Sequence, residues 1–144
     1  MHRGRRGGGL DARKKAVRRE RGRLSHARGL RAEALAVFLL RLKGYRILAR
    51  RLKTHAGEID ILARRGNTLA IVEVKARAGE DTAREALLPA QQARLRRAGE
   101  QLFAMRPALA DCDLRFDLVL VTPSPLPLGF PGGWPRHIPD AWRD

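Results

Sequence analysis

Two stretches of the chain alternate apolar and polar positions with the two-residue period of β-strands. They cover residues 57–64 and 69–76, and the Gly66-Asn67 pair between them is typical of a two-residue hairpin turn. In the second stretch, one face is wholly apolar and must be covered by other parts of the protein. The sequence therefore predicts a β-hairpin at the centre of a sheet, with helices packed on it.

The same hairpin gathers charged side chains. If the turn has two residues, Asp60 faces Glu73 and Glu58 faces Lys75. Directly opposed side chains have Cβ atoms about 5 Å apart, so three carboxylates there would repel one another unless a cation or a proton intervened. An arrangement with that energetic cost indicates a functional site.

Apolar residues recur at helical spacing in two other parts of the chain. Residues 28–43 form an amphipathic pattern that ends before Gly44, a common helix stop. A second helix is predicted from Pro89, because proline suits the first helical turn. Its apolar stripe consists of Leu95, Ala98, Leu102 and Met105.

Two further stretches are predicted to be strands. Residues 45–52 alternate apolar and basic positions, which gives a strand with one face toward solvent or a ligand. Residues 114–121 are apolar on nearly both faces. In the hairpin, the alternation of a regular strand places Ile59 on the same face as Ile61. Together the elements predict an α/β fold with a central mixed sheet of about four to five strands flanked by helices.

The remaining segments are predicted to be irregular. Residues 78–88 mix charged and small residues and are expected to form a loop that covers the site. Proline and glycine make residues 123–135 an extended crossing. Residues 136–144 are expected to form a short terminal turn that docks Ile138 and Trp142 on the core, since packing is a commoner use of so few aromatics than stacking on bases.

The length of 144 residues predicts one domain, over residues 26–144. Residues 1–25 hold ten basic and two acidic residues with few apolar ones, so they are predicted to be a disordered basic tail. Two interpretations of this tail stay open. It either lies along phosphates and releases counterions, or is only a solvated extension.

The net charge of +15 favours a polyanionic partner, with nucleic acid first and DNA preferred to RNA. The single cysteine, Cys112, excludes an intrachain disulfide framework. No apolar run reaches the length of a membrane span, and the N-terminus has no hydrophobic signal region. We therefore expect a soluble, cytoplasmic protein with no membrane partner.

The chemistry predicted for the hairpin is metal-assisted phosphodiester hydrolysis. The carboxylates of Asp60 and Glu73 are hard ligands of the kind that hold Mg²⁺ or Mn²⁺. The ammonium group of Lys75 can position the attacking water and offset developing negative charge. Asp followed at hairpin distance by Glu-x-Lys is a more specific signal than Glu-x-Lys alone, which strands produce by chance.

Five other polar residues admit a functional and a structural interpretation. From spacing alone, an exposed Glu33 near a helix start is favoured over a buried acid, and a surface His55 over a ligand. Asp117 is interpreted as half of a buried pair with a basic residue. Arg94 and Arg97 lie on the outer surface of the second helix, where they contact either phosphates or only solvent.

Several separated motifs occur in order between the first helix and the C-terminus. They are Gly29 with Ala32-Glu33, Gly44-Tyr45, Gly57-Glu58-Ile59-Asp60, Val72-Glu73-Val74-Lys75, Gln92 with Leu95, Arg115-Phe116-Asp117, and His137-Ile138 with Ala141-Trp142. The hairpin resembles the Asp…Glu-x-Lys core of the PD-(D/E)xK, or restriction-endonuclease-like, superfamily. Across all these motifs the chain is similar to the YraN-like family of small bacterial proteins, which has that fold.

The resemblance implies roles for particular residues. Asp60 and Glu73 would be metal ligands and Lys75 the catalytic lysine, with Glu33 and Gln92 reaching the same pocket from the two helices. Two glutamines stand at 91–92 where similar sequences usually have Lys-Gln, and residues 1–25 lie outside the match. Glu58, opposite the lysine, is expected to support it rather than bind the metal.

The leading hypothesis is a Mg²⁺- or Mn²⁺-dependent nuclease that acts on DNA, with branched or damaged DNA suggested by analogy alone. Cleavage of junctions would suggest a homodimer, although no pattern in the sequence identifies a dimer interface. A second hypothesis is a nucleic-acid-binding accessory protein that keeps the fold without turnover, because binding needs only the cationic surface. A third is a structural network of acids and lysine with no ligand.

Overall fold

A computed structural model describes residues 8–76, 88–121 and 135–142, with residues 8 and 21–28 by their backbone only. The elements in chain order are α1 (Gly8–Leu42), β1 (Arg46–Thr54), β2 (Gly57–Arg65), β3 (Thr68–Ala76), α2 (Pro89–Met105), the 3₁₀ helix η2 (Pro107–Leu109), β4 (Asp113–Val121) and β5 (Arg136–Ile138). The predicted loop at 78–88 and the crossing at 123–135 lie almost wholly outside this description.

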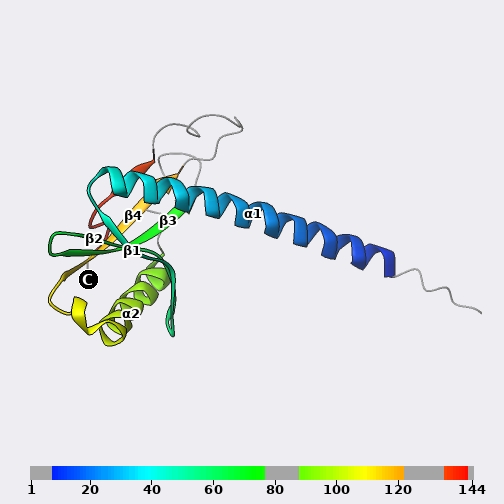
Figure 1. The fold of residues 1–144 in the computed structure, drawn as a ribbon. Coiled ribbons are helices and arrows are strands. Elements are labelled where there is room, and N and C mark those ends of the chain that lie inside the picture. Colours follow the sequence, from blue (N-terminus) through cyan, green and yellow to red (C-terminus); the bar gives the residue numbers. More distant parts are fainter. Residues whose placement is uncertain (1–7, 77–87, 122–134, 143–144) are drawn as a thin grey trace, which may run out of the picture.

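The five strands form one mixed sheet in the order β1-β2-β3-β4-β5. Neighbouring strands are antiparallel except for β3 and β4, which run parallel and are connected through α2. The C-terminal part of α1 packs on one face of the sheet and α2 on the other (Figure 1). The predicted α/β architecture is confirmed, and the hairpin of β2 and β3 occupies the centre of the sheet.

The hairpin has the predicted register near its turn, but the predicted pairs of Asp60 with Glu73 and of Glu58 with Lys75 are not part of the β2–β3 ladder. Arg65 pairs with Thr68 and the ladder continues to Ile61 opposite Val72, around a two-residue turn in which Gly66 has a φ of 61°. This left-handed conformation is one that glycine adopts at little cost. Beyond the Ile61 pair the ladder ends, although both strands continue.

Two apolar clusters hold the layers together, one on each face of the sheet. The cluster on the α2 side contains Leu95 and Leu102, and the cluster on the α1 side contains Ala36 and Leu40. Ile59 belongs to the α2 side, whereas Ile61 belongs to the α1 side. The alternation predicted for these two isoleucines is therefore wrong, because the regular strand period is lost at the intervening Asp60.

Helix α1 is longer than predicted, since it begins at Gly8 rather than at residue 28. The structure is thus helical where the sequence predicts disorder between residues 8 and 25, while residues 1–7 are outside the description. The described side chains from Gly9 to Glu20 are all exposed, so no packing holds this part. Its many Ala, Arg, Lys and Leu residues favour helix intrinsically, and they extend a helix that packing stabilises further along. It projects away from the sheet (Figure 1).

Two details near the C-terminus and on α2 differ from the prediction. Residues 136–138 form the edge strand β5 instead of a turn, because they pair with β4. Trp142 is buried and stacks on Phe116 at a centroid distance of 5.1 Å, as the packing interpretation requires. Met105, the last residue of α2, is half exposed and lines a hollow beside the β1–β2 turn instead of packing in the core. Among the described helices, none is both long and apolar enough to cross a membrane.

Candidate active site

The site lies where β2 and β3 stop pairing. Asp60 on β2 accepts a hydrogen bond on Oδ2 from the backbone N–H of Val74 at 2.9 Å, so its carboxylate is held beside β3. On β3, Nζ of Lys75 lies 3.4 Å from Oε1 of Glu73. The structure thus brings together the Asp60, Glu73 and Lys75 side chains that the sequence pattern singled out.

Glu73 is buried, and its environment favours the neutral form of the acid. Its Oε2 atom is buried and has no hydrogen-bond partner among the described residues. Burial and the neighbouring Asp60 carboxylate raise the pKa of Glu73 to about 7, although the charges of Lys75 and Arg94 lower it in part. The group therefore carries a proton or needs a second cation near neutral pH.

The pKa of Asp60 is raised as well. Burial raises the pKa of Asp60, while hydrogen bonds from Val74 and with Glu73 and the charge of Lys75 lower it in part. Glu33 also acts on this group, because its negative charge raises the pKa. Two carboxyl groups that each resist ionisation thus share one pocket.

Arg94 reaches the site from α2. Its Nη1 donates to the carbonyl oxygen of Glu58 at 3.1 Å, and its Nη2 lies 4.0 Å from Oε2 of Glu73. The side chain passes directly over Gly57, where an added Cβ would lie 2.6 Å from Nη1. Gly57 also has a φ of 131°, which L side chains rarely adopt. The glycine therefore gives Arg94 the room to reach the site.

Glu33 is buried, so the interpretation of this residue as an exposed helix-start acid is wrong. Oε1 accepts from Nε of Arg50 at 3.0 Å, and Oε2 accepts from Nε of Arg51 at 2.9 Å. Both arginines come from β1, the strand whose basic face was predicted to meet solvent or a ligand. The burial of the acid is possible because each carboxylate oxygen has a cationic partner.

The other predicted site residues take varied positions. The side chain of Glu58 is exposed, and the structure records an interaction with its carbonyl rather than with its carboxylate. Gln92 is half-buried in the first turn of α2, and its part in the site stays a prediction. Arg97 is exposed on the same helix, and His55 is exposed in the β1–β2 turn, as expected for a surface histidine.

A second polar cluster, centred on Asp117, was foreseen only as a buried pair. Asp117 is fully buried and accepts from Nε and Nη2 of Arg115, both at 2.7 Å, and from the backbone N–H of Asp140 at 3.0 Å. Nε2 of His137 lies 2.8 Å from its Oδ2. Burial alone would raise the pKa of Asp117, but these hydrogen bonds and the charge of Arg115 lower it to about 2. The cluster ties β5 to β4.

The carboxylate pair fits a divalent cation by its donor chemistry. Two carboxyl groups with hard oxygen donors lie together, and one oxygen of Glu73 is buried without a hydrogen bond among the described residues. No group of three or more His, Cys, Asp or Glu side chains gathers as a ligand set anywhere in the described ranges. The assignment of Asp60 and Glu73 as metal ligands therefore stays a prediction, in which water would complete the shell as Mg²⁺ usually requires.

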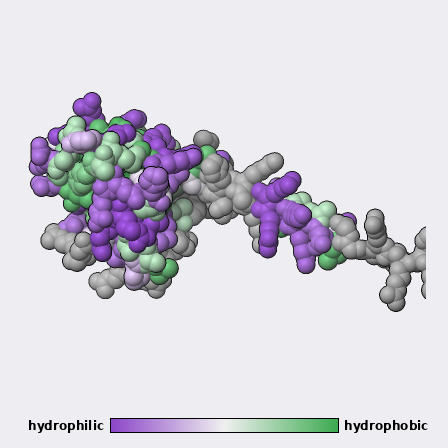
Figure 2. All heavy atoms as spheres, turned by 90° about the horizontal axis from the view of Figure 1, so that it is seen from below, coloured by the Kyte–Doolittle hydropathy of each residue, from purple (hydrophilic) through white to green (hydrophobic). Residues whose placement is uncertain are grey.

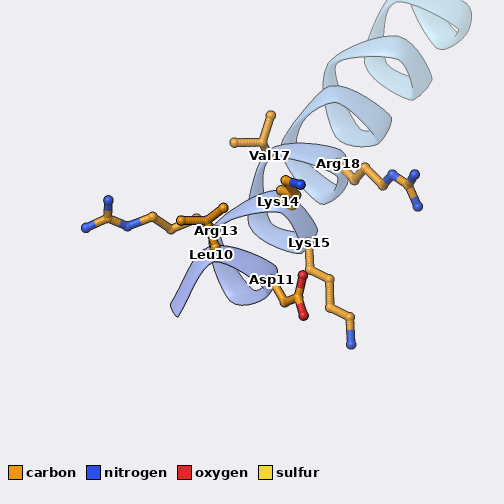
Figure 3. Close-up of a pocket in the computed structure, with 7 residues that line it drawn as sticks. All are labelled: Leu10, Asp11, Arg13, Lys14, Lys15, Val17 and Arg18. Atoms are coloured by element: carbon orange, nitrogen blue, oxygen red, sulfur yellow. The ribbon is translucent and has the colours of Figure 1, made fainter. Parts of the chain in front are cut away.

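The described side chains on the projecting part of α1 form no comparable site. A shallow hollow follows its first turns, lined by side chains of this helix alone: Leu10, Asp11, Arg13, Lys14, Lys15, Val17 and Arg18. Figure 3 shows these side chains pointing away from one another instead of converging. The described part of the projection is largely hydrophilic, whereas the body shows polar side chains around apolar ones (Figure 2).

Sequence comparison identifies relatives along most of the chain. Residues 32–121 match the model of the uncharacterised protein family UPF0102. A UPF0102 protein of Parvibaculum lavamentivorans is 59% identical over 122 residues, which cover 85% of this chain and 86% of the relative. A similar protein of Paramagnetospirillum magneticum is 53% identical, over 81% of this chain and 87% of the relative. One of Caulobacter vibrioides is 48% identical, over 88% of this chain and 94% of the relative. The match to the family model includes both carboxylates and the lysine of the site.

Proposed function

This chain belongs to the uncharacterised protein family UPF0102, and because that name states no activity, we propose from the site itself that the protein is a metal-dependent nuclease that hydrolyses phosphodiester bonds in DNA. Membership agrees with the YraN-like resemblance of the sequence. The observation that carries the proposal is the convergence of Asp60 and Glu73 beside Lys75, with Oε2 of Glu73 buried and without a hydrogen bond among the described residues.

The electrostatics of the pair argue for a cation. Two ionised carboxylates that are both partly buried repel each other, and the charges of Lys75 and Arg94 do not lower the pKa of Glu73 to its ordinary value. A proton on Glu73 or a divalent cation relieves the repulsion. Hard oxygen donors favour Mg²⁺ or Mn²⁺, and such an ion supplies charge stabilisation for a transferring phosphoryl group.

Other residues around the carboxylate pair have separate proposed roles. Val74 holds the Asp60 carboxylate in place, and Arg94 holds the β2 backbone at Glu58 close to α2. Lys75 is the group placed to orient a water molecule and to offset negative charge that develops on the phosphate. The lysine is half-buried, so its ammonium group is less strongly solvated than a surface lysine.

The charge of the protein supports a nucleic-acid substrate. The net charge is +15, and even the chain after residue 25 is basic. DNA is the proposed substrate ahead of RNA, with branched or damaged DNA as the specific form and the cytoplasm as the location. A homodimer would suit the cleavage of junctions.

One observation favours a second candidate, a nucleic-acid-binding accessory protein without turnover. The pKa of Glu73 is raised to about 7, so a proton can take the place of a metal and leave the pocket stable without an ion. In that case Asp60→Asn and Glu73→Gln leave the affinity for DNA intact or raise it by removing repulsion.

The deciding experiment is a cleavage assay with Lys75→Ala and its matched control Lys53→Ala. Lys53 is an exposed lysine on β1, so its removal changes the charge equally without touching the carboxylates. With Mn²⁺ or Mg²⁺, the native protein and Lys53→Ala should cleave branched, single-stranded or duplex DNA. Lys75→Ala should lose at least about a hundredfold in rate. Cleavage that survives in Lys75→Ala would come from a contaminant and would refute the proposal.

A further inference from the structure

A single buried carboxylate on α1 fixes two arginines of β1. The side chain of Glu33 is 9% exposed, and each of its oxygens accepts from one Nε atom, of Arg50 at 3.0 Å and of Arg51 at 2.9 Å. One negative charge thus faces two positive charges. The cluster formed by these three residues, which we call the arginine fork, carries a net positive charge.

The outer ends of both guanidinium groups point to the surface. The side chains of Arg50 and Arg51 are 45% and 38% exposed, and Glu33 occupies only their Nε atoms. Among the described residues, no hydrogen bond is recorded for the terminal nitrogens of either arginine. Planar guanidinium groups bind phosphate oxygens through paired N–H donors, and fixing them beforehand lowers the entropy lost on binding.

The backbone of β1 is distorted so that this arrangement can form. Consecutive residues of a strand normally project to opposite faces of the sheet. Arg51 has a φ of 49°, a left-handed conformation that is strained for a residue other than glycine. The distortion lets two adjacent side chains reach the same carboxylate. Strained residues of this kind concentrate at functional sites, where the surrounding structure holds them.

The fork borders the carboxylate pair. In the β1–β2 ladder, Arg50 pairs with Ile61 and Leu52 pairs with Ile59, so Arg51 lies opposite Asp60. A phosphate held by the fork would therefore lie next to the proposed point of hydrolysis.

We propose that Arg50 and Arg51 form a binding site for the phosphodiester backbone of the substrate, and that Glu33 is a positioning residue that holds them ready. The choice of nucleic acid as the ligand rests on the proposed function. The geometry of the fork does not depend on turnover. This role differs from the one that the family resemblance implies for Glu33, which is that of an acid acting directly in the pocket.

The test is fluorescence anisotropy of a short labelled DNA duplex with chelator present, so that no cleavage occurs. Arg50→Lys with Arg51→Lys keeps the net charge and an ion pair with Glu33 but removes the planar donor pairs. Its control is Arg13→Lys with Arg18→Lys, which makes the same exchange at exposed positions on α1 (Figure 3). The fork variant should bind about fivefold to tenfold more weakly, with a similar salt dependence because its charge is unchanged, while the control stays within about twofold.

If thermal unfolding shows that the fork variant and the native protein are both folded, equal affinity for DNA would refute the phosphate-binding role of the arginine fork. Glu33→Gln gives a second readout of opposite sign. Simple electrostatics predicts tighter binding when an acid is removed, whereas loss of positioning predicts weaker binding, so tighter binding would refute the role of Glu33. Failure of the nuclease proposal is distinguishable, because it would leave the DNA affinities in chelator unchanged and abolish only metal-dependent cleavage.

Discussion

The backbone N–H of Val74 donates to Oδ2 of Asp60 at 2.9 Å, just beyond the point where the β2–β3 ladder ends. A side chain of one strand thus takes the place of a backbone partner of the other. The bond fixes the Asp60 carboxylate beside Glu73, in a register that the Gly66-Asn67 turn determines. The carboxylate pair is therefore a consequence of how the hairpin ends its pairing.

The raised pKa of Glu73 predicts a stability that falls with rising pH when no metal is bound. The folded protein keeps the proton of this group up to about pH 7, whereas the unfolded chain releases it near the ordinary value of 4.5. The unfolded state thus binds fewer protons between these values, and stability decreases across this window. Below it the contribution is fully present. The predicted loss is about 2 to 3 kcal/mol.

Urea denaturation with chelator at pH 5 and pH 8 measures this effect. Glu73→Gln should abolish most of the difference between the two pH values, because glutamine is neutral throughout. Glu58→Gln is the matched control, since that side chain is exposed, and it should keep the full difference. The same pH dependence in Glu73→Gln would show that another group is responsible.

Replacement of Gly57 by alanine should move Arg94 from the site. The new Cβ would lie 2.6 Å from Nη1 and 3.2 Å from Cδ of that arginine, at a backbone angle that alanine adopts with strain. We expect a loss of about 2 kcal/mol in the free energy of unfolding. Gly44→Ala separates the two causes, because Gly44 also has a positive φ of 89° but its nearest neighbour is 3.9 Å away. Equal thermal shifts for both variants would mean that the Arg94 contact contributes nothing.

Replacement of Asp117 by asparagine should destabilise the protein by about 3 to 4 kcal/mol, because Arg115 loses its buried counter-charge. The pKa of Asp117 is lowered from its ordinary value of 3.8 to about 2, so its ionised form stabilises the folded protein. This contribution is fully present above pH 3.8 and is lost as the pH falls through about 2. Asp111→Asn, at an exposed position, is the control in urea denaturation at neutral pH. A loss below about 1 kcal/mol would contradict the buried ion pair as a major tie between β4 and β5.

Much of the fold was predictable because its signals are local. The Gly66-Asn67 turn specifies the hairpin register, and Pro89 marks the start of α2. Three of the site residues, Asp60, Glu73 and Lys75, follow from that register. The strand period and the turn length bring these residues to the same end of the hairpin, but the hydrogen bond that holds Asp60 where the period is lost was not predicted.

Other features depend on contacts between distant segments, which no local pattern reveals. The burial of Glu33 depends on two arginines of a later strand, and from spacing alone it was expected to be exposed. The strained φ of Arg51 has no signature in the sequence. The basic periodicity of residues 45–52 was the available signal, and it suggested a ligand-facing strand without identifying Glu33 as the partner.

The most direct test of the central claim is a titration with Mn²⁺, followed by electron paramagnetic resonance at pH 8, on the native protein, Asp60→Asn, Glu73→Gln and Glu58→Gln. The account predicts saturable binding that weakens at least about tenfold when either Asp60 or Glu73 loses its charge. Glu58→Gln should bind as the native protein does. Equal binding by all four proteins, or no binding by the native protein, would contradict the claim that these two carboxylates hold the metal.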